Sequence, residues 1–228
     1  MKLTIFAFVI FSVATCSAQH QFKVTNPSKT VTVSIDVAAC DTDCHGAAKF
    51  TFARTGEPRA FQTVRLPDTQ IWLGDDGKPS ANVTLLYDQQ SVVNFGDFNF
   101  DGQEDVAICD GGDGAYGSPT YRVYLHSPAS KRYVYSPAFS ALAHDDALGM
   151  FEIDAKKKML MKASKSGCCW HRTQGFSVVS NTPKLVYEFT EDATQNAGET
   201  VKIISRKLTA GKWKTSVKRA KTSDYYKN

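Results

Sequence analysis

The sequence predicts an all-β protein whose antiparallel hairpins are arranged as a β-propeller-like fold, with a β-sandwich as the alternative. Short runs of β-branched and aromatic residues recur at regular spacing with turn residues between them, and no long segment has a helical period. The similarity between the hairpins at residues 50–64 and 121–135 favours repeated, blade-like units. No linker rich in Pro, Gly or Ser divides the chain, so residues 19–228 are expected to form a single domain.

Strands are expected wherever apolar and polar residues alternate with period two between turn signals. A short helical turn is expected at residues 139–144. The predicted strands cover residues 31–37, 48–52, 60–64, 71–73, 82–87, 91–95, 106–109, 121–126, 133–135, 151–154, 159–162, 175–179, 185–189, 200–205 and 213–217.

Residues 1–18 have the pattern of a secretory signal peptide: a basic residue, an apolar run, and small residues at the cleavage site. Acylation of Cys16 is an alternative, but Thr15 in front of it departs from the usual lipid-attachment pattern. No later apolar run is long enough to span a bilayer. We therefore expect a periplasmic or secreted protein without a lipid anchor or a transmembrane segment.

The charge of the chain is concentrated near its end. The formal net charge is +4, and residues 202–228 hold nine Lys or Arg against a single acidic residue, Asp224. Such a segment could contact nucleic acid or an anionic envelope surface. Export argues against nucleic acid, and the simplest interpretation is the solvated face of a hairpin at the edge of a sheet.

Five cysteines follow the leader, and in an oxidising compartment disulfides are the default for them. Cys40 and Cys44 can close a small loop, and Cys109 could meet one member of the vicinal pair, Cys168 and Cys169. Because five is odd, either one thiol stays free or the vicinal pair bonds to itself. Zinc ligation by the cysteines next to histidines is less favoured, because no Cys-x2-Cys spacing supports it.

Residues 96–108 have the pattern of a calcium loop. Oxygen-bearing side chains stand at alternate positions, a glycine that permits a sharp bend follows the third of them, and an apolar run begins soon after. A hard cation takes six to eight oxygen ligands, and without it the carboxylates would repel one another. The predicted ligands of a structural Ca²⁺ ion are Asp97, Asn99, Asp101, the backbone carbonyl near Gln103, and Asp105.

The residues of this loop have two other interpretations. An EF-hand requires a bidentate Glu at its twelfth position and an exiting helix, but that position is Ile108 and residues 106–109 are predicted as a buried strand. The EF-hand is therefore rejected. A solvated Asx-type turn without an ion remains the second alternative.

The glycine-rich segment 110–119 must form a loop that projects from the end of the strand at 106–109. Its aromatic residue, Tyr116, could enter an enzyme cleft at a small entropic cost if the loop is rigid, with Asp113 or Ser118 adding polar contacts. The alternative is that Tyr116 folds back onto Tyr121 or Pro119.

The segments 99–108, 112–116 and 121–142 resemble a family of exported bacterial calcium-binding proteins. That family includes periplasmic inhibitors that act as immunity proteins against peptidoglycan-hydrolase toxins from rival cells. The loop is also similar to the FG-GAP calcium loops of integrin-type propellers. The resemblance implies a β-propeller-like fold, a structural calcium ion and a peptidoglycan hydrolase as partner. It is clearest over 92–190, and the extra cysteines and the amino-terminal third depart from the pattern.

The function expected from these features is that of a calcium-stabilised, monomeric periplasmic inhibitor that binds and blocks a peptidoglycan hydrolase or lysozyme-like toxin. The alternative is a non-catalytic glycan-binding or adhesion module that uses Trp72, Trp170 or Trp213 as sugar platforms. No Gly-x-Ser-x-Gly or His-Glu-x-x-His motif is present. Asp145 and Asp146 are adjacent, so they point to different faces and are expected to be solvated loop residues, which argues against an enzyme.

Overall fold

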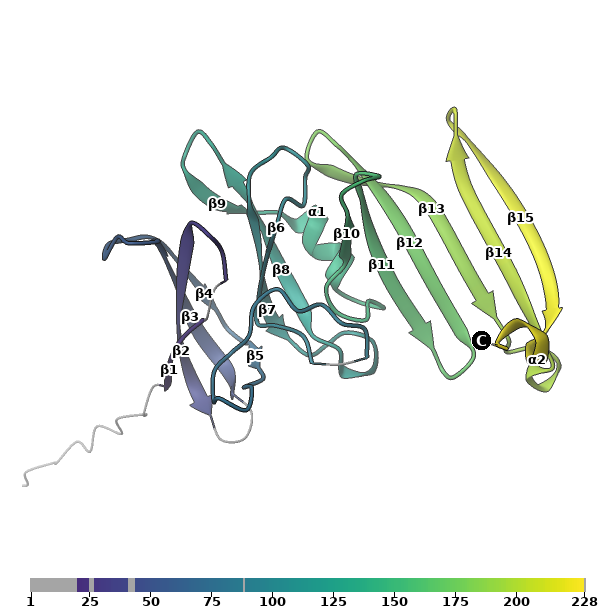
Figure 1. Cartoon of the computed structure of the whole chain (residues 1–228), viewed down its shortest axis with the longest axis horizontal. Helices are drawn as coiled ribbons and strands as arrows, with labels where there is room; N and C mark the ends of the chain where they lie inside the picture. Colours follow the sequence, from purple (N-terminus) through teal and green to yellow (C-terminus); the bar gives the residue numbers. More distant parts are fainter. Residues whose placement is uncertain (1–19, 25–26, 41–43, 88, 228) are drawn as a thin grey trace, which may run out of the picture.

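Three antiparallel β-sheets follow one another along the chain and lie side by side (Figure 1). The structure is a computed structural model that describes residues 20–24, 27–40, 44–87 and 89–227. The predicted signal peptide, with Cys16, lies outside the described residues. The all-β prediction is confirmed, and the strands pair mainly with their neighbours in sequence, as hairpins do.

The first sheet has the strand order β1-β2-β3-β4, with β5 paired to β3. The alternation predicted for its central strands is visible in their burial: Phe50 and Phe52 of β3 are fully buried, while the residues between and beside them are partly exposed. The strands are β1 His20–Lys23, β2 Val31–Cys40, β3 Cys44–Arg54, β4 Ala60–Leu66 and β5 Gln70–Ile71.

The second sheet, of order β6-β7-β8-β9, lies between the other two (Figure 1). It carries the short helical turns η1 and, after its last strand, α1 and η2, which agree with the helical turn expected at 139–144. The elements are β6 Val93–Gly96, β7 Asp105–Gly111, η1 Ala115–Gly117, β8 Thr120–Ser127, β9 Arg132–Tyr135, α1 Pro137–Ser140 and η2 Ala141–Ala143.

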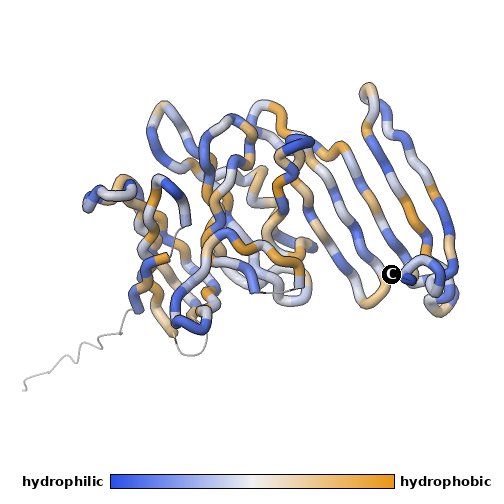
Figure 2. The backbone as a smooth tube through the Cα atoms, in the orientation of Figure 1, coloured by the Kyte–Doolittle hydropathy of each residue, from blue (hydrophilic) through white to orange (hydrophobic). Residues whose placement is uncertain are grey.

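The third sheet runs β10-β11-β12-β13-β14-β15 without interruption. Its last strands extend away from the rest of the molecule, and polar residues predominate along β15 (Figure 2). The elements are β10 Glu152–Asp154, β11 Met159–Ser166, β12 Trp170–Val179, β13 Thr182–Asp192, η3 Asn196–Gly198, β14 Thr200–Thr209, β15 Lys212–Lys221 and α2 Thr222–Tyr225.

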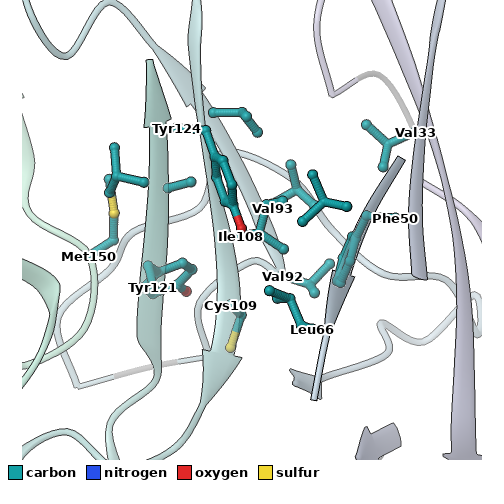
Figure 3. Close-up of a cluster of buried hydrophobic side chains, with 14 of the residues drawn as sticks. Val33, Phe50, Leu66, Val92, Val93, Ile108, Cys109, Tyr121, Tyr124 and Met150 are labelled. Carbon is teal, nitrogen blue, oxygen red and sulfur yellow. The ribbon is translucent and has the colours of Figure 1, made fainter. Parts of the chain in front are cut away.

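The hydrophobic core covers both faces of the second sheet. Phe50 and Leu66 of the first sheet point toward Val93 and Ile108, while Met150 lies on the other side of the sheet (Figure 3). All four residues from Val106 to Cys109 are fully buried, so successive side chains on both faces of β7 are covered. A strand that is covered on both faces has apolar residues at successive positions, as residues 106–109 do.

The propeller-like arrangement is not found. The sheets formed by the described residues do not close into a ring, and the third sheet continues through six strands rather than ending as a separate blade. The first and second sheets pack against a common core, which agrees with the β-sandwich alternative. Hairpin periodicity is local and is the same in both architectures, so it could not distinguish them.

Two local predictions can also be judged. The strand predicted at 82–87 is wrong: these residues form turns and irregular chain, with Asn82 and Tyr87 in the left-handed region at φ of 61° and 62°. Within the described part of the chain, no helix has the length and apolar character needed to cross a membrane.

The five cysteines of the described residues form two disulfides, Cys40–Cys44 and Cys168–Cys169, and leave Cys109 as a buried free thiol. The short loop closure and the self-bonded vicinal pair are therefore confirmed, and a Cys109 bridge to the vicinal pair is not formed. The zinc alternative is not supported, because Cys44 is bonded to Cys40 and Cys169 is bonded to Cys168.

Candidate functional site

The segment between β7 and β8 forms the predicted loop and is rigidly closed. The N–H of Gly114 donates to the carbonyl of Ser118 at 3.0 Å, and the N–H of Ser118 donates to the carbonyl of Ala115 at 3.1 Å. The N–H of Ala115 also donates to the carbonyl of Ala147 at 3.1 Å, which ties the loop to the chain before the third sheet. A Cβ atom at Gly114 would lie 2.7 Å from the Ser118 oxygen, so this closure requires glycine.

Tyr116 lies at the tip of this loop and is 66% exposed. Its backbone is in the left-handed region at φ 57° and ψ 31°, a conformation that the loop hydrogen bonds maintain. Its hydroxyl accepts a hydrogen bond from the N–H of Gly167, next to the vicinal disulfide in the β11–β12 turn. Tyr121 is fully buried and donates to the carbonyl of Ser91, so Tyr116 is not folded back onto it.

The side chain of Tyr116 borders a groove with a volume of about 540 Å³. The Nζ atom of Lys165 lies 5.5 Å from the ring centre of Tyr116 and 4.9 Å from that of Tyr87, within range for cation–π attraction to both rings. Tyr87 is 67% exposed, so two aromatic rings and a cation face solvent together. The lining residues are Trp72, Tyr87, Gln89, Gln90, Tyr116, Gly117, Ser118, Pro119, Leu148 and Lys165.

Gln90 fixes one wall of the groove. Its side chain is buried, its amide nitrogen donates to the carbonyl of Leu148 at 3.1 Å, and its amide oxygen accepts the N–H of Met150 at 2.9 Å. Gly149 leaves no room for a side chain, because a Cβ atom there would lie 2.2 Å from the Gln90 oxygen. The segment 147–150 therefore contacts both Gln90, close to Tyr87, and the loop that carries Tyr116.

Charged residues behind the loop connect the second sheet to the residues after η2. Asp110 contacts Arg122 at 3.0 Å and His144 Nε2 at 3.3 Å. Burial acts to raise the pKa of Asp110, but hydrogen bonds from His144, Thr120 and Arg122 outweigh it and the pKa lies below its usual value. The hydrogen bond to Asp110 raises the pKa of His144. These groups stabilise the base of the loop.

Asp146 is not the solvated loop residue that we predicted. It forms ion pairs with Lys162, at 2.8 Å, and with Arg172, both of which belong to the third sheet. Its carboxylate is thus engaged in connecting the sheet to the preceding segment. Asp145 is exposed, in agreement with the prediction.

The predicted cation loop lies between β6 and β7 and is closed by its own hydrogen bonds. Both carboxylate oxygens of Asp97 accept backbone N–H groups, from Asp101 and Gly102, at 2.9 Å. Asp101 accepts the N–H of Gln103 at 2.8 Å and the side-chain N–H of Asn99 at 2.9 Å. Gly102 has a φ of 85°, the sharp bend expected of it. These contacts alone are those of an Asx-type turn.

Asp105 closes this loop from the inside. Its two oxygens accept the N–H groups of Phe98 at 2.9 Å and His126 at 2.8 Å, so it connects the loop to β8. The side chain is fully buried, and burial raises its pKa to about 7. The sequence predicted Asp105 as a calcium ligand, and in the structure its carboxylate joins the loop to β8.

The predicted ligands offer oxygen atoms, the donor type that Ca²⁺ prefers. In the described residues, no group of three or more His, Cys, Asp or Glu side chains gathers where it could hold a metal ion. The calcium site therefore stays a prediction.

The structure brings together only part of the predicted partner site. Tyr116 and Ser118 line the groove, while Asp113 is exposed outside it. Trp72, predicted as a sugar platform, also lines the groove, whereas Trp170 and Trp213 lie on the third sheet, beside Arg172 and Arg206.

Sequence reasoning missed Tyr87, Gln90 and Lys165. The segment before Tyr87 was predicted as a strand, which would have placed this residue in a ladder rather than at a groove. The polar run 88–91 that follows was the available signal that the strand prediction was doubtful.

No family model matches the sequence, and no curated protein matches it. A solved structure described as a Xanthomonas type IV secretion system related protein is similar to this chain, with a TM-score of 0.67 and 22% sequence identity. The similarity covers 90% of this chain and 96% of the other. At this identity the likeness shows a shared fold over nearly the full length of both proteins.

Proposed function

We propose that this chain is an exported, non-catalytic inhibitor that binds and blocks a peptidoglycan hydrolase or a lysozyme-like toxin. The observation that carries the proposal is Tyr116: an exposed aromatic side chain at the tip of a loop whose backbone is held by several hydrogen bonds. A rigid aromatic residue contributes a large contact area without a large ordering cost on binding. An inhibitory loop needs both properties.

The surroundings of Tyr116 support a protein partner. The rings of Trp72 and Tyr87 and the ammonium group of Lys165 share the same groove, so apolar area and positive charge are adjacent. Aromatic residues are enriched at the energetic centre of protein interfaces. Catalytic clefts of polysaccharide hydrolases contain carboxylates, which a lysine at the rim of the inhibitor would attract.

The shared fold also supports an envelope role. The solved structure that this chain resembles is described as related to a type IV secretion system of Xanthomonas. A protein associated with bacterial secretion is compatible with the export that residues 1–18 predict.

The test is inhibition of purified hydrolases acting on labelled peptidoglycan. A muramidase, a lytic transglycosylase and an amidase are assayed with and without the chain, and Tyr116→Ala is compared with the unchanged protein at the enzyme that responds. The variant should lose inhibition by about 100-fold, the effect of a strong interface residue. Its melting temperature should be unchanged.

The matched control is Tyr226→Ala, another exposed tyrosine, which contacts Tyr225 and lies far from the groove in α2 and its cap. This variant should inhibit as well as the unchanged chain. Equal inhibition by the Tyr116 and Tyr226 variants, or no inhibition of any of the three enzyme classes, would contradict the proposal.

A glycan-binding module is the second candidate, because three aromatic rings line one groove. It predicts that the chain sediments with insoluble peptidoglycan in the absence of any hydrolase, and that Trp72→Ala abolishes this binding. Sedimentation without inhibition would favour the module over the inhibitor.

A further inference from the structure

The last strand of the third sheet has a free edge. The strand order ends at β15, whose ten residues all pair with β14 on one side. The other strands that pair on one side only are shorter, from two residues in β5 to seven in β4. Among the described residues, β15 is thus the longest strand with an unpaired side. Such an edge is a template for an added strand.

The turn before β15 shows which backbone groups face outward. Thr209 pairs with Lys212 across a two-residue turn, with Ala210 and Gly211 at φ of 49° and 75°, as in a type I′ hairpin. The pair that flanks such a turn is hydrogen-bonded, and the bonding alternates along the ladder. The N–H and C=O groups of Trp213, Thr215, Val217, Arg219 and Lys221 therefore point away from β14.

The two faces of β15 carry different side chains because successive residues alternate. Trp213 and Val217 share one face and are 37% and 53% exposed, and Leu208 lies opposite Trp213 on β14. The other face carries Lys212, Lys214 and Lys218. Arg219 and Lys221 share the face of Trp213 and Val217, so one face is apolar near the turn and basic towards the end of β15, and the other face is basic along its length.

The positive charge of β15 indicates which kind of strand could pair with its open edge. A second copy would place the lysines of two β15 strands against each other, and like charges on facing strands are destabilising. Lysines on an edge also discourage unselective pairing. An extended acidic segment meets neither obstacle, because its carboxylates would lie opposite the lysines.

We propose that β15 binds an extended, acidic segment of a partner protein, which adds to the third sheet as an antiparallel strand. The bound segment alternates acidic residues with β-branched or aromatic ones. The acidic residues lie opposite Lys212, Lys214 and Lys218, and the apolar residues lie opposite Trp213 and Val217. This surface is distinct from the Tyr116 groove, and the inference does not depend on the proposed inhibitor function.

The apolar and the acidic residues of such a segment alternate, so their backbone N–H groups point in opposite directions. Residues opposite Trp213 and Val217 form hydrogen-bonded pairs, so the N–H groups of the apolar residues point at β15. The N–H groups of the acidic residues point away from it. N-methylation, which removes an N–H donor, should therefore block binding only at the apolar positions.

The probe is a synthetic ten-residue peptide that alternates Glu with Val or Thr, and its binding to the full chain is measured by fluorescence anisotropy at low salt. N-methylation of two Val positions should weaken binding by about tenfold or more, while N-methylation of two Glu positions should leave it unchanged. A peptide of equal composition with its Glu residues grouped should bind weakly. Added salt should weaken binding.

The protein side is tested with a matched pair of charge reversals. Lys214→Glu should weaken binding of the alternating peptide by about tenfold. Lys156→Glu, in the exposed β10–β11 turn, should not change it. Hydrogen exchange should slow in β15 when the peptide binds, which places it on the edge.

Several results would overturn the inference. Equal binding of the two N-methylated peptides would show attraction by charge alone, without strand addition. Binding of phosphatidylglycerol vesicles but not of the peptide would assign the basic face to a membrane. Sedimentation of the chain as a dimer with β15 protected would assign the edge to a second copy.

Discussion

The strands β7 and β15 differ in how the rest of the molecule uses them. β7 is central in the second sheet, and its residues Val106 to Cys109 are fully buried. β15 ends the third sheet, and nine of its ten residues are exposed. Both strands belong to antiparallel ladders, so backbone pairing alone does not account for the difference. The difference lies in what packs against the faces of each strand. The buried strand β7 contributes to the stability of the fold, whereas the exposed strand β15 is free to bind a partner.

The contrast extends to the loops beside these strands. The segments before and after β7 are held by side chains and backbone groups from several parts of the chain, including Asp105, Ala147 and Gln90. The hairpin of β14 and β15 closes with a two-residue turn. Tyr116 is thus held on a fixed loop next to the buried strand, while the long open edge lies at the far end of the third sheet.

The largest expected effect tests burial in the two strands. Ile108→Ala in β7 should lower the free energy of unfolding by about 2–5 kcal/mol, because it removes a fully buried side chain and leaves a cavity. Val217→Ala in β15 should change it by about 0.5 kcal/mol or less. Urea unfolding of both variants measures the difference, and similar losses would show that the outer hairpin is covered in solution.

A smaller effect is expected from calcium, if the loop before β7 binds it. Free Ca²⁺ at 100 times its dissociation constant should stabilise the fold by about 2.7 kcal/mol, because the ion binds only the folded chain. Chelation should speed hydrogen exchange in β6 and β7 and leave β14 and β15 unchanged.

Asp101→Ala serves as the control for the calcium effect, because it removes one predicted ligand on an exposed turn. This variant should show no shift of its melting temperature with Ca²⁺. If the unchanged chain also shows no shift, and no ion is found by native mass spectrometry, the loop is an Asx-type turn alone.

The smallest effect concerns pH at the junction of the second sheet with the segment before the third. The folded pKa of His144 is raised by Asp110, so the protonated form is favoured in the native state. This contribution is fully present below the unfolded pKa of about 6.5 and is lost as pH rises through the higher folded pKa. We expect about 1 kcal/mol or less, because His144 is partly exposed.

The free energy of unfolding is measured for the unchanged chain and for His144→Gln in buffers at about pH 5.5 and about pH 8.5. The variant should show a smaller decrease than the unchanged chain between these two conditions. Burial raises the pKa of Asp105 to about 7, so Asp105 contributes a decrease of its own over this range, and that part should remain in the variant. Asp110 has a lowered pKa, so its own contribution is lost only as pH falls through the acid range and does not interfere. A decrease of equal size in the variant would contradict the role of this pair.

Much of the local structure was predictable because its causes are local. The alternation at 48–52 and the apolar run at 106–109 predicted strands, and the glycines of 110–119 predicted a loop, since each follows from backbone conformation and side-chain period. The closure of Cys40 with Cys44 followed from short separation. The strand at 82–87 failed because its apolar residues do not have a neighbouring strand to pair with over that length.

The groove could be predicted only in part. Tyr116, Ser118 and Trp72 were singled out as residues able to make contacts, but the sequence did not show that Lys165, from a strand about fifty positions later, lies against the same rings. Such proximity depends on how the third sheet meets the second. The roles of Asp146 and His144 depended on the same packing.

By itself the sequence determined the all-β class, the hairpins, the cysteine pairing options and the loop that carries Tyr116, because propensity, period and turn chemistry act between near neighbours. Only the tertiary structure decided that the sheets do not close into a ring, that β7 is covered on both faces, and that β15 is left open. These features depend on which sheet surfaces meet, and that is settled by burial summed over segments far apart in the chain.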